Sequence, residues 1–334
     1  DEPGRVQQNQ ANGRSTRTGS DGIMKSMNAA DADLSMPVVT VNGVDYVVGS
    51  DFVTAVGFRY KWDEEDNQFL IGDNDATFAL KPGAKEAIRE EAPVALTDAP
   101  ILHESRFLIP ISTLGPIFSE DIAFEIRGKT LHIEPSGVAV DAAMDGPEEA
   151  NTGAELDFED DPDDPFKGGE GMDAESEATL KPLIDELEKE MREQEAVPVL
   201  KNIDMNSVIR RGKRYLGVKY DFGAKPYPQS GRFDCSTFTQ YVFGKHGVKL
   251  NRTARAQAKQ GSAVSRKKLR KGDLMFFYVP GRFKSNKTVG HVGIYMGNQK
   301  MLHSSPEPKN GVQITNINKA YWKKTYLRSK RVAY

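Results

Sequence analysis

Short runs of alternating hydrophobic and polar residues fill residues 36–136, and turn residues separate the runs. "VVTV" and "VDYVV" flank Asn42 and Gly43, the strongest short-range signal for a two-residue β-hairpin. "SDFVTAVGF", which follows, predicts a short helix with Ser50 as its N-cap and Gly57 as its stop. The pattern indicates a compact domain built mainly from short strands.

The order of strand, short helix and paired strands occurs twice in this domain. "DYVVGSDFVTAVGFRYKWDEEDNQFLI" at 45–71 is echoed by "RFLIPISTLGPIFSEDIAFEIRGKTLHI" at 106–133. We expect an internal duplication with a period of about 60 residues.

The pattern changes at Asp204, which begins the helical stretch "DMNSVIRRGKRYLG" ending at Gly217. Two further helices begin after the capping residues Asp234 and Thr253. Strand patterns follow at "DLMFFYV", "HVGIYMG", "KMLHSS" and "GVQITNI". Helices first and antiparallel strands afterwards predict an α+β domain over 201–334.

The segments outside these domains are polar. Residues 137–178 carry 15 Asp and Glu against one Lys, which predicts a disordered acidic linker over 137–200 with a possible short helix at 180–195. Residues 1–35 predict a disordered leader, and a first residue other than Met indicates a trimmed product that has lost any signal peptide. No apolar run approaches the ~18 residues of a membrane span, so we expect no transmembrane segment.

The two halves of the chain carry opposite charge. Residues 201–334 hold 29 Lys and Arg against 5 Asp and Glu, whereas residues 1–200 hold 16 against 43. The basic half should bind an anionic partner. One hypothesis is that the acidic linker lies on it transiently; the alternative is that the linker is a plain spacer. A nucleic-acid module would show aromatic residues interleaved with Arg on an exposed sheet, and no such run is present, so we predict no nucleic-acid partner.

Cys235 is the one cysteine of the chain and cannot form an internal disulfide. Asp234 is expected to cap the helix that follows, which places a half-covered thiol in its first turn. The helix dipole and free backbone N–H groups should lower the thiol pKa below about 8.5. This local pattern suits a nucleophile and a small core residue equally well.

His291 and His303 are the candidate bases. Strand alternation puts His291 and Gly293 on one face, and a three-residue hairpin loop at 297–299 would place His303 opposite Gly293 on that face; a two-residue loop would separate the two imidazoles. In the N-terminal domain, the remaining histidines lack the spacing of metal ligands, so neither a metal nor a cofactor is predicted.

Residues 36–136 resemble the copper amine oxidase N-terminal-like domain, a β-rich stalk found on exported proteins of Gram-positive bacteria. The resemblance implies a structural or wall-contacting role, with neither copper nor oxidase activity.

Residues 201–334 resemble the NlpC-type cell-wall cysteine peptidases, which have a papain-like α+β fold. The resemblance is carried by "KYDFGA", "FDCSTFTQYVF", "LNRTARAQ", "LRKGDLMFF", "HVGIYMG" and "MLHSS", in that order. It implies that Cys235 is the nucleophile, that His291 is the general base and acid, and that His303 orients His291. It further implies that Tyr220 assists at the oxyanion, and that Asp234 and Ser236 bind the free amine of the substrate.

The activity implied is that of a secreted thiol protease without a cofactor, a D,L-endopeptidase that cleaves the γ-D-glutamyl-diamino acid bond of peptidoglycan stem peptides through a thioester. Its partners would be stem peptides and anionic cell-wall polymers, and its location the wall of a bacterium of Gram-positive type. The alternatives are another acyl transfer at the same site, as in an amidase, transpeptidase or poly-γ-glutamate hydrolase, and a non-catalytic basic module that binds polyanions.

Overall fold

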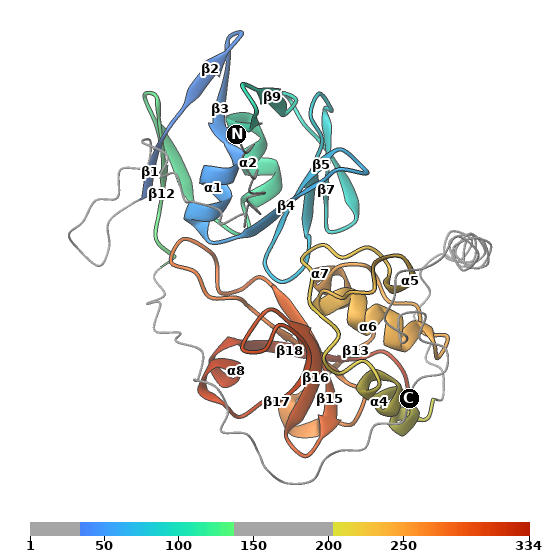
Figure 1. Ribbon diagram of the computed structural model, residues 1–334. Helices are drawn as coiled ribbons and strands as arrows, with labels where there is room; N and C mark the ends of the chain where they lie inside the picture. The colour runs from blue at the N-terminus through green and yellow to red at the C-terminus, as the bar shows by residue number, and fades with distance from the viewer. Residues whose placement is uncertain (1–33, 137–202) are drawn as a thin grey trace, which may run out of the picture.

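The computed structural model describes residues 34–136 and 203–334, which form two domains in contact (Figure 1). The predicted leader, acidic linker and short helix at 180–195, and the hypothesised placement of the linker on the basic domain, lie outside the described residues. Leu34 and Ser35, assigned to the leader by prediction, belong to strand β1 of the N-terminal domain.

The N-terminal domain consists of three antiparallel sheets and two short helices. The strands, in spatial order within each sheet, are β1 (Leu34–Pro37), β12 (Thr130–Ile133) and β11 (Phe124–Arg127); β2 (Val39–Val41), β3 (Val44–Val48), β10 (Arg106–Pro110) and β9 (Ile101–His103); and β4 (Arg59–Asp63), β5 (Gln68–Gly72), β6 (Phe78–Leu80), β7 (Glu86–Arg89) and β8 (Ala92–Ala95). The helices are α1 (Gly49–Val56) and α2 (Ile111–Phe118). A single apolar core joins both helices and every strand except β2 and β9.

The predicted hairpin at Asn42 and Gly43 is confirmed, because Val41 pairs with Val44 and both turn residues have positive φ. The start predicted for the following helix is wrong. Helix α1 begins at Gly49 with Val48 at the N-cap, and Ser50 lies inside it. Gly57 ends the helix in the left-handed conformation at φ 91°, as predicted. The order of elements β3, α1, β4, β5 occurs again as β10, α2, β11, β12, which agrees with the expected internal duplication.

The C-terminal domain has a six-stranded antiparallel sheet with helices packed on both faces, so the α+β prediction is confirmed. The helices are α4 (Met205–Lys213), α5 (Tyr227–Ser230), α6 (Cys235–Gly244), α7 (Ala254–Gln257) and α8 (Ala320–Thr325), with a 3-10 turn at Arg266–Lys268. The strands in spatial order are β13 (Ser262–Val264), β18 (Tyr326–Arg331), β14 (Leu274–Phe277), β15 (His291–Gly297), β16 (Lys300–Ser305) and β17 (Gly311–Asn316). Of the helices in residues 34–136 and 203–334, none has the length and apolar character needed to cross a membrane.

Local sequence explains how helix α6 is placed. Asp234 caps its N-terminus, and the buried side chains of Phe238 and Val242 join the core that the sheet also forms. The predicted caps Asp204 and Thr253 accept hydrogen bonds from backbone N–H groups of their helices as well. Helix α4 stops at Lys213, four residues before the predicted stop.

Opposite charges form part of the contact between the domains, beside an apolar cluster of Leu70, Tyr220 and Phe222. The Arg255 guanidinium of α7 donates to both carboxylate oxygens of Asp121 in the N-terminal domain at 2.5 and 3.0 Å, and both side chains are buried. Lys284 is paired with Asp73, also in a buried position. At the rim Lys225 lies 2.5 Å from Asp66. Part of the anionic partner that the basic domain was expected to bind is therefore the N-terminal domain of the same chain.

Asp121→Ala should lower the free energy of unfolding by about 3 to 5 kcal/mol, because the Arg255 charge stays buried without its main partner. The neighbouring Glu120→Ala is a matched control, since Glu120 pairs with Arg89 while 58% of its side chain is exposed, and should cost at most about 1 kcal/mol. Urea unfolding followed by tryptophan fluorescence measures both. Equal losses in the two variants would show that the buried pair does not hold the domains together.

Candidate active site

Cys235 is the first residue of helix α6, as its position after Asp234 predicts. The Asp234 carboxylate accepts a hydrogen bond from the Thr237 backbone N–H at 2.8 Å, and the Thr237 hydroxyl accepts one from the Asp234 backbone N–H at 2.8 Å. This reciprocal cap fixes the first turn and therefore the direction of the thiol. The Val292 backbone N–H of strand β15 also points to the sulfur.

His291 and His303 lie side by side on the sheet. The turn between their strands contains only Asn298 and Gln299, so the predicted three-residue loop is not formed. The strand pairing nevertheless shifts by one residue between Tyr295 and Gly297, and this shift places the two imidazoles on the same face, as the longer loop would have done. His303 therefore faces Gly293, and the His291 Nε2 atom lies 2.8 Å from His303 Nδ1.

A continuous hydrogen-bonded chain runs through both imidazoles. The Asn74 Nδ2 group lies 2.9 Å from His291 Nδ1, and His303 Nε2 lies 2.8 Å from the hydroxyl of Thr315. An amide nitrogen can only donate, so His291 Nδ1 is the acceptor and a neutral His291 carries its proton on Nε2. His291 then donates to His303, which donates to Thr315. The Nδ1 lone pair is thus the basic end of the chain.

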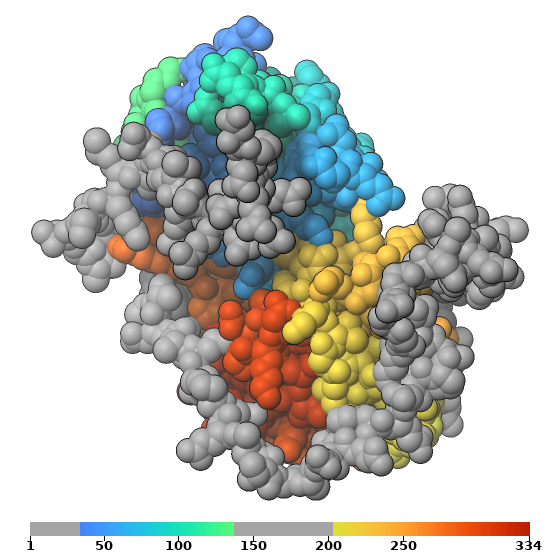
Figure 2. All heavy atoms as spheres, in the orientation of Figure 1, coloured from blue at the N-terminus to red at the C-terminus, as the bar shows by residue number. Residues whose placement is uncertain are grey.

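The carbonyl oxygen of Asn74 is the common partner of two predicted catalytic residues. It accepts hydrogen bonds from the Cys235 thiol at 3.3 Å and from the Tyr220 hydroxyl at 3.2 Å. Asn74 belongs to residues 73–76, which form most of the loop between β5 and β6, so the N-terminal domain reaches into this site. Figure 2 shows blue atoms of that domain extending to the line where the yellow and red parts of the C-terminal domain meet.

Asp234 and Ser236 lie together at the start of α6, with Ser236 Oγ donating to Asp234 at 3.2 Å. The Arg252 guanidinium lies 2.6 Å from Asp234 and donates to Ser236 at 3.0 Å. Asp75 of the loop accepts from the Ala254 backbone N–H at 2.6 Å and interacts with both Ser236 and Asp234. The group predicted to bind an ammonium is therefore occupied by residues of the same chain.

The thiol differs from the expectation in exposure and in acidity. Cys235 is fully buried rather than half covered. Burial raises the pKa of the thiol, and the negative charges of Asp75 and Asp234 raise it further. The predicted lowering of the pKa by the helix terminus is wrong for this arrangement, because desolvation and two carboxylates outweigh the favourable backbone N–H groups.

The structure brings together all six predicted site residues, Cys235, His291, His303, Tyr220, Asp234 and Ser236, and their catalytic roles stay predictions. Sequence reasoning missed the loop residues Asn74 and Asp75, which come from the other domain. It also missed Trp322 of α8, whose ring centroid lies 5.4 and 5.2 Å from those of His291 and His303. In the sequence, Arg252 is marked only by its position within "LNRTARAQ", one of the blocks that carry the family resemblance.

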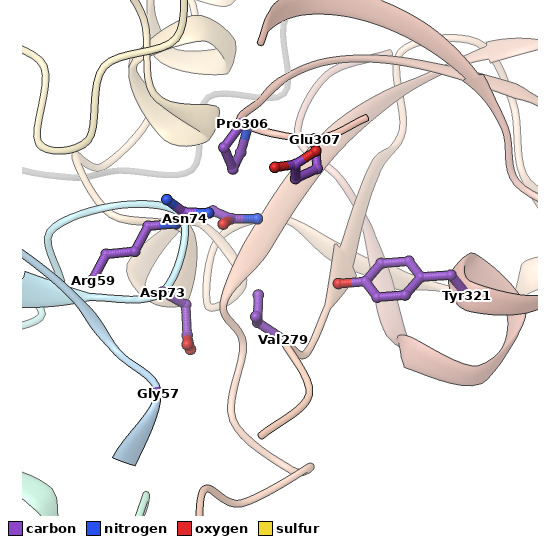
Figure 3. Close-up of a pocket in the computed structure, with 8 residues that line it drawn as sticks. All are labelled: Gly57, Arg59, Asp73, Asn74, Val279, Pro306, Glu307 and Tyr321. Carbon is purple, nitrogen blue, oxygen red and sulfur yellow. The ribbon is translucent and has the colours of Figure 1, made fainter. Parts of the chain in front are cut away.

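A pocket of about 160 Å³ lies beside the loop, between the two domains (Figure 3). Asp73 and Asn74 line it on one side, and Glu307 and Tyr321 line it on the other. Cys235 is not among the eight residues that line it. Within the described parts of the chain, no group of three His, Cys, Asp or Glu side chains has an arrangement that could hold a metal ion.

Comparison with known proteins matches residues 217–331 to the NlpC/P60 family. The C-terminal domain is an NlpC/P60 domain. Residues 26–133 match the copper amine oxidase N-terminal domain. Both resemblances identified in the sequence are thereby confirmed.

The relatives share the NlpC/P60 domain rather than the whole chain. The murein DD-endopeptidase MepS/murein LD-carboxypeptidase of Escherichia coli is 36% identical over 40% of this chain and 66% of its own length. The gamma-DL-glutamyl hydrolase of Bacillus subtilis is 37% identical over 38% of this chain and 29% of its own length. A solved NlpC/P60 family protein from Bacillus cereus is 30% identical over 40% of this chain and 41% of its own, with a TM-score of 0.35. The chain thus spans less than two thirds of each of these proteins.

Acid should destabilise the protein through His291. Burial lowers the pKa of His291 from its usual value near 6.5 to about 3, so only the unfolded chain takes up this proton between these values. The contribution of His291 to the free energy of unfolding is complete above pH 6.5 and decreases as the pH falls towards 3. At pH 5 the free energy of unfolding is lower by about 2 kcal/mol for this reason. Urea unfolding at pH 7 and pH 5 should show this extra loss in the natural chain and not in His291→Gln. Parallel pH dependence in the two proteins would contradict a buried, neutral His291.

Proposed function

We propose that this protein is a cysteine peptidase of the cell wall, a D,L-endopeptidase that cleaves the γ-D-glutamyl-diamino acid bond of peptidoglycan stem peptides. The observation that carries the proposal is that, within an NlpC/P60 domain, a helix-start cysteine and the His291 imidazole both contact Asn74. The far side of that imidazole is held by His303, which in turn contacts Thr315. The names of the relatives, an endopeptidase of murein and a γ-glutamyl hydrolase, support this class of substrate.

The proposed reaction begins when His291 Nδ1 takes the proton of the Cys235 thiol. The sulfur then attacks the γ-glutamyl carbonyl carbon, and the Tyr220 hydroxyl donates to the oxyanion that forms. The C–N bond breaks as His291 returns the proton to the leaving amine, which gives a thioester. Water, deprotonated by His291, hydrolyses the thioester and restores the thiol. His303 holds the His291 imidazole in place throughout, because its Nδ1 atom accepts a hydrogen bond from the Nε2–H group of His291.

The free amine of the stem peptide is assigned to the buried carboxylate of Asp234 and to Ser236. An ammonium group suits this position because a charge-assisted hydrogen bond compensates for its desolvation. Arg252 already holds Asp234, so the ammonium would share the carboxylate with it. This arrangement supports a preference for stems that have been released from their sugar.

Location and further partners are part of the same proposal. An exported enzyme at a Gram-positive wall would find stem peptides there, and the excess of basic residues in 201–334 suits a wall that carries anionic polymers. The relative named as a γ-glutamyl hydrolase favours one second candidate, cleavage of the same type of bond in a poly-γ-glutamate chain.

Cys235→Ala should lower the release of products from soluble stem peptides by at least about 10³-fold, because the covalent step is lost. The assay is mass spectrometry of a digest that contains free-amine stems, sugar-linked stems and poly-γ-glutamate. Loss of the γ-glutamyl bond in free-amine stems is the expected result. Undiminished cleavage by the variant would refute the proposed nucleophile, and cleavage confined to poly-γ-glutamate would select the second candidate.

A further inference from the structure

Loop 73–76 of the N-terminal domain is buried although its residues are polar. Asp73, Asn74 and Asp75 expose between 0 and 6% of their surface, whereas loops ordinarily lie on the protein surface. Each has a partner in the NlpC/P60 domain: Asp73 pairs with Lys284, the Asn74 backbone N–H donates to the Gly290 carbonyl at 3.0 Å, and the Asp75 carboxylate accepts from the Ala254 N–H at 2.6 Å. The NlpC/P60 domain thus binds Asp73, Asn74 and Asp75 through specific polar contacts.

Asn74 engages the two groups whose contact the proposed reaction requires. Its carbonyl oxygen accepts from the Cys235 thiol, and its side-chain amide donates to Nδ1 of His291. The thiol proton and the lone pair that should receive it are therefore both bonded to Asn74. We propose that the N-terminal domain is an intramolecular inhibitor of the NlpC/P60 domain, with loop 73–76 as the inhibitory element. This inference rests on the proposed peptidase function of that domain.

The loop occupies the place of the proposed substrate but runs in the opposite direction. In the proposed complex, the chain runs from the free amine at Asp234 and Ser236 towards the scissile carbonyl at Cys235. In the structure, the carbonyl at Cys235 belongs to Asn74, and the following residue, Asp75, lies at Asp234 and Ser236. The thiol also donates to the carbonyl oxygen, so its proton has not moved to His291. The Asn74 peptide bond is bound in a form that does not lead to acyl transfer.

A substrate cannot enter while the loop is in place. Cys235 and His303 are 0% exposed and His291 is 1% exposed, and the pocket beside the loop does not reach the sulfur. The charge of Asp75 also helps to keep the thiol protonated, since it raises the pKa of Cys235. Activation therefore requires the loop to leave, either alone or with the whole N-terminal domain.

Two glycine substitutions in the full chain provide a matched test. A Cβ atom on Gly72, directly before the loop, would lie 1.9 Å from the Asp75 carbonyl oxygen, so Gly72→Ala cannot keep the present loop conformation. A Cβ on Gly115, in α2 of the same domain, meets nothing within 4 Å, so Gly115→Ala is the control. Lys284→Met is a second opening variant, because it removes the partner of Asp73 from the other domain.

The measurements are the rate at which iodoacetamide alkylates Cys235 and the rate of stem-peptide cleavage. Gly72→Ala and Lys284→Met should raise the alkylation rate by at least about tenfold over the natural chain and Gly115→Ala, because a larger fraction of molecules is open. Cleavage of soluble stems should rise in parallel. Unchanged alkylation in both opening variants, folded by circular dichroism, would overturn the inhibitory contact. Faster alkylation without stem cleavage would uphold that contact and refute the proposed substrate instead.

Discussion

The Asn74 peptide lies between a thiol and an imidazole, and the rest of the closed structure depends on this placement. Asn74 supplies an acceptor for Cys235 and Tyr220 and a donor for His291, so three buried polar groups of the NlpC/P60 domain are satisfied by one residue of the N-terminal domain. Without such partners each of these groups would carry a desolvation cost in a buried site. The contact therefore stabilises the closed arrangement and blocks the proposed chemistry at the same time.

Charge helps to explain how two domains that match different families hold this loop in a buried position. Two buried ion pairs, Arg255 with Asp121 and Lys284 with Asp73, connect the two domains. The basic member of each pair comes from residues 201–334, which have an excess of Lys and Arg. Buried pairs are sensitive to the loss of one member, since the remaining charge stays desolvated. The interface is thus stable when complete and weakened by any change that removes a single partner, a property suited to a contact that must open.

The sequence was sufficient to predict the parts of the site that depend on local order along one domain. Asp234 before Cys235 predicted a capped helix start, and alternation in "HVGIYMG" placed His291 on the correct face. The acidity of the thiol was predicted wrongly, because it depends on burial and on Asp75, more than 150 residues away along the chain. "GDNDAT" has the composition of an ordinary surface turn, and nothing in its letters indicates that Asn74 meets a predicted catalytic residue of another domain.

The ionisation of Cys235 in the unmodified full chain tests the central claim most directly. The rate of alkylation by iodoacetamide would be measured across the pH range with peptide mapping to assign the label. If loop 73–76 covers Cys235, alkylation is slow at neutral pH and rises only well above the pH at which a free thiol ionises, because burial and nearby carboxylates raise the thiol pKa. Rapid alkylation at pH 7 with a midpoint below about pH 8 would show an exposed, activated thiolate and would contradict the account.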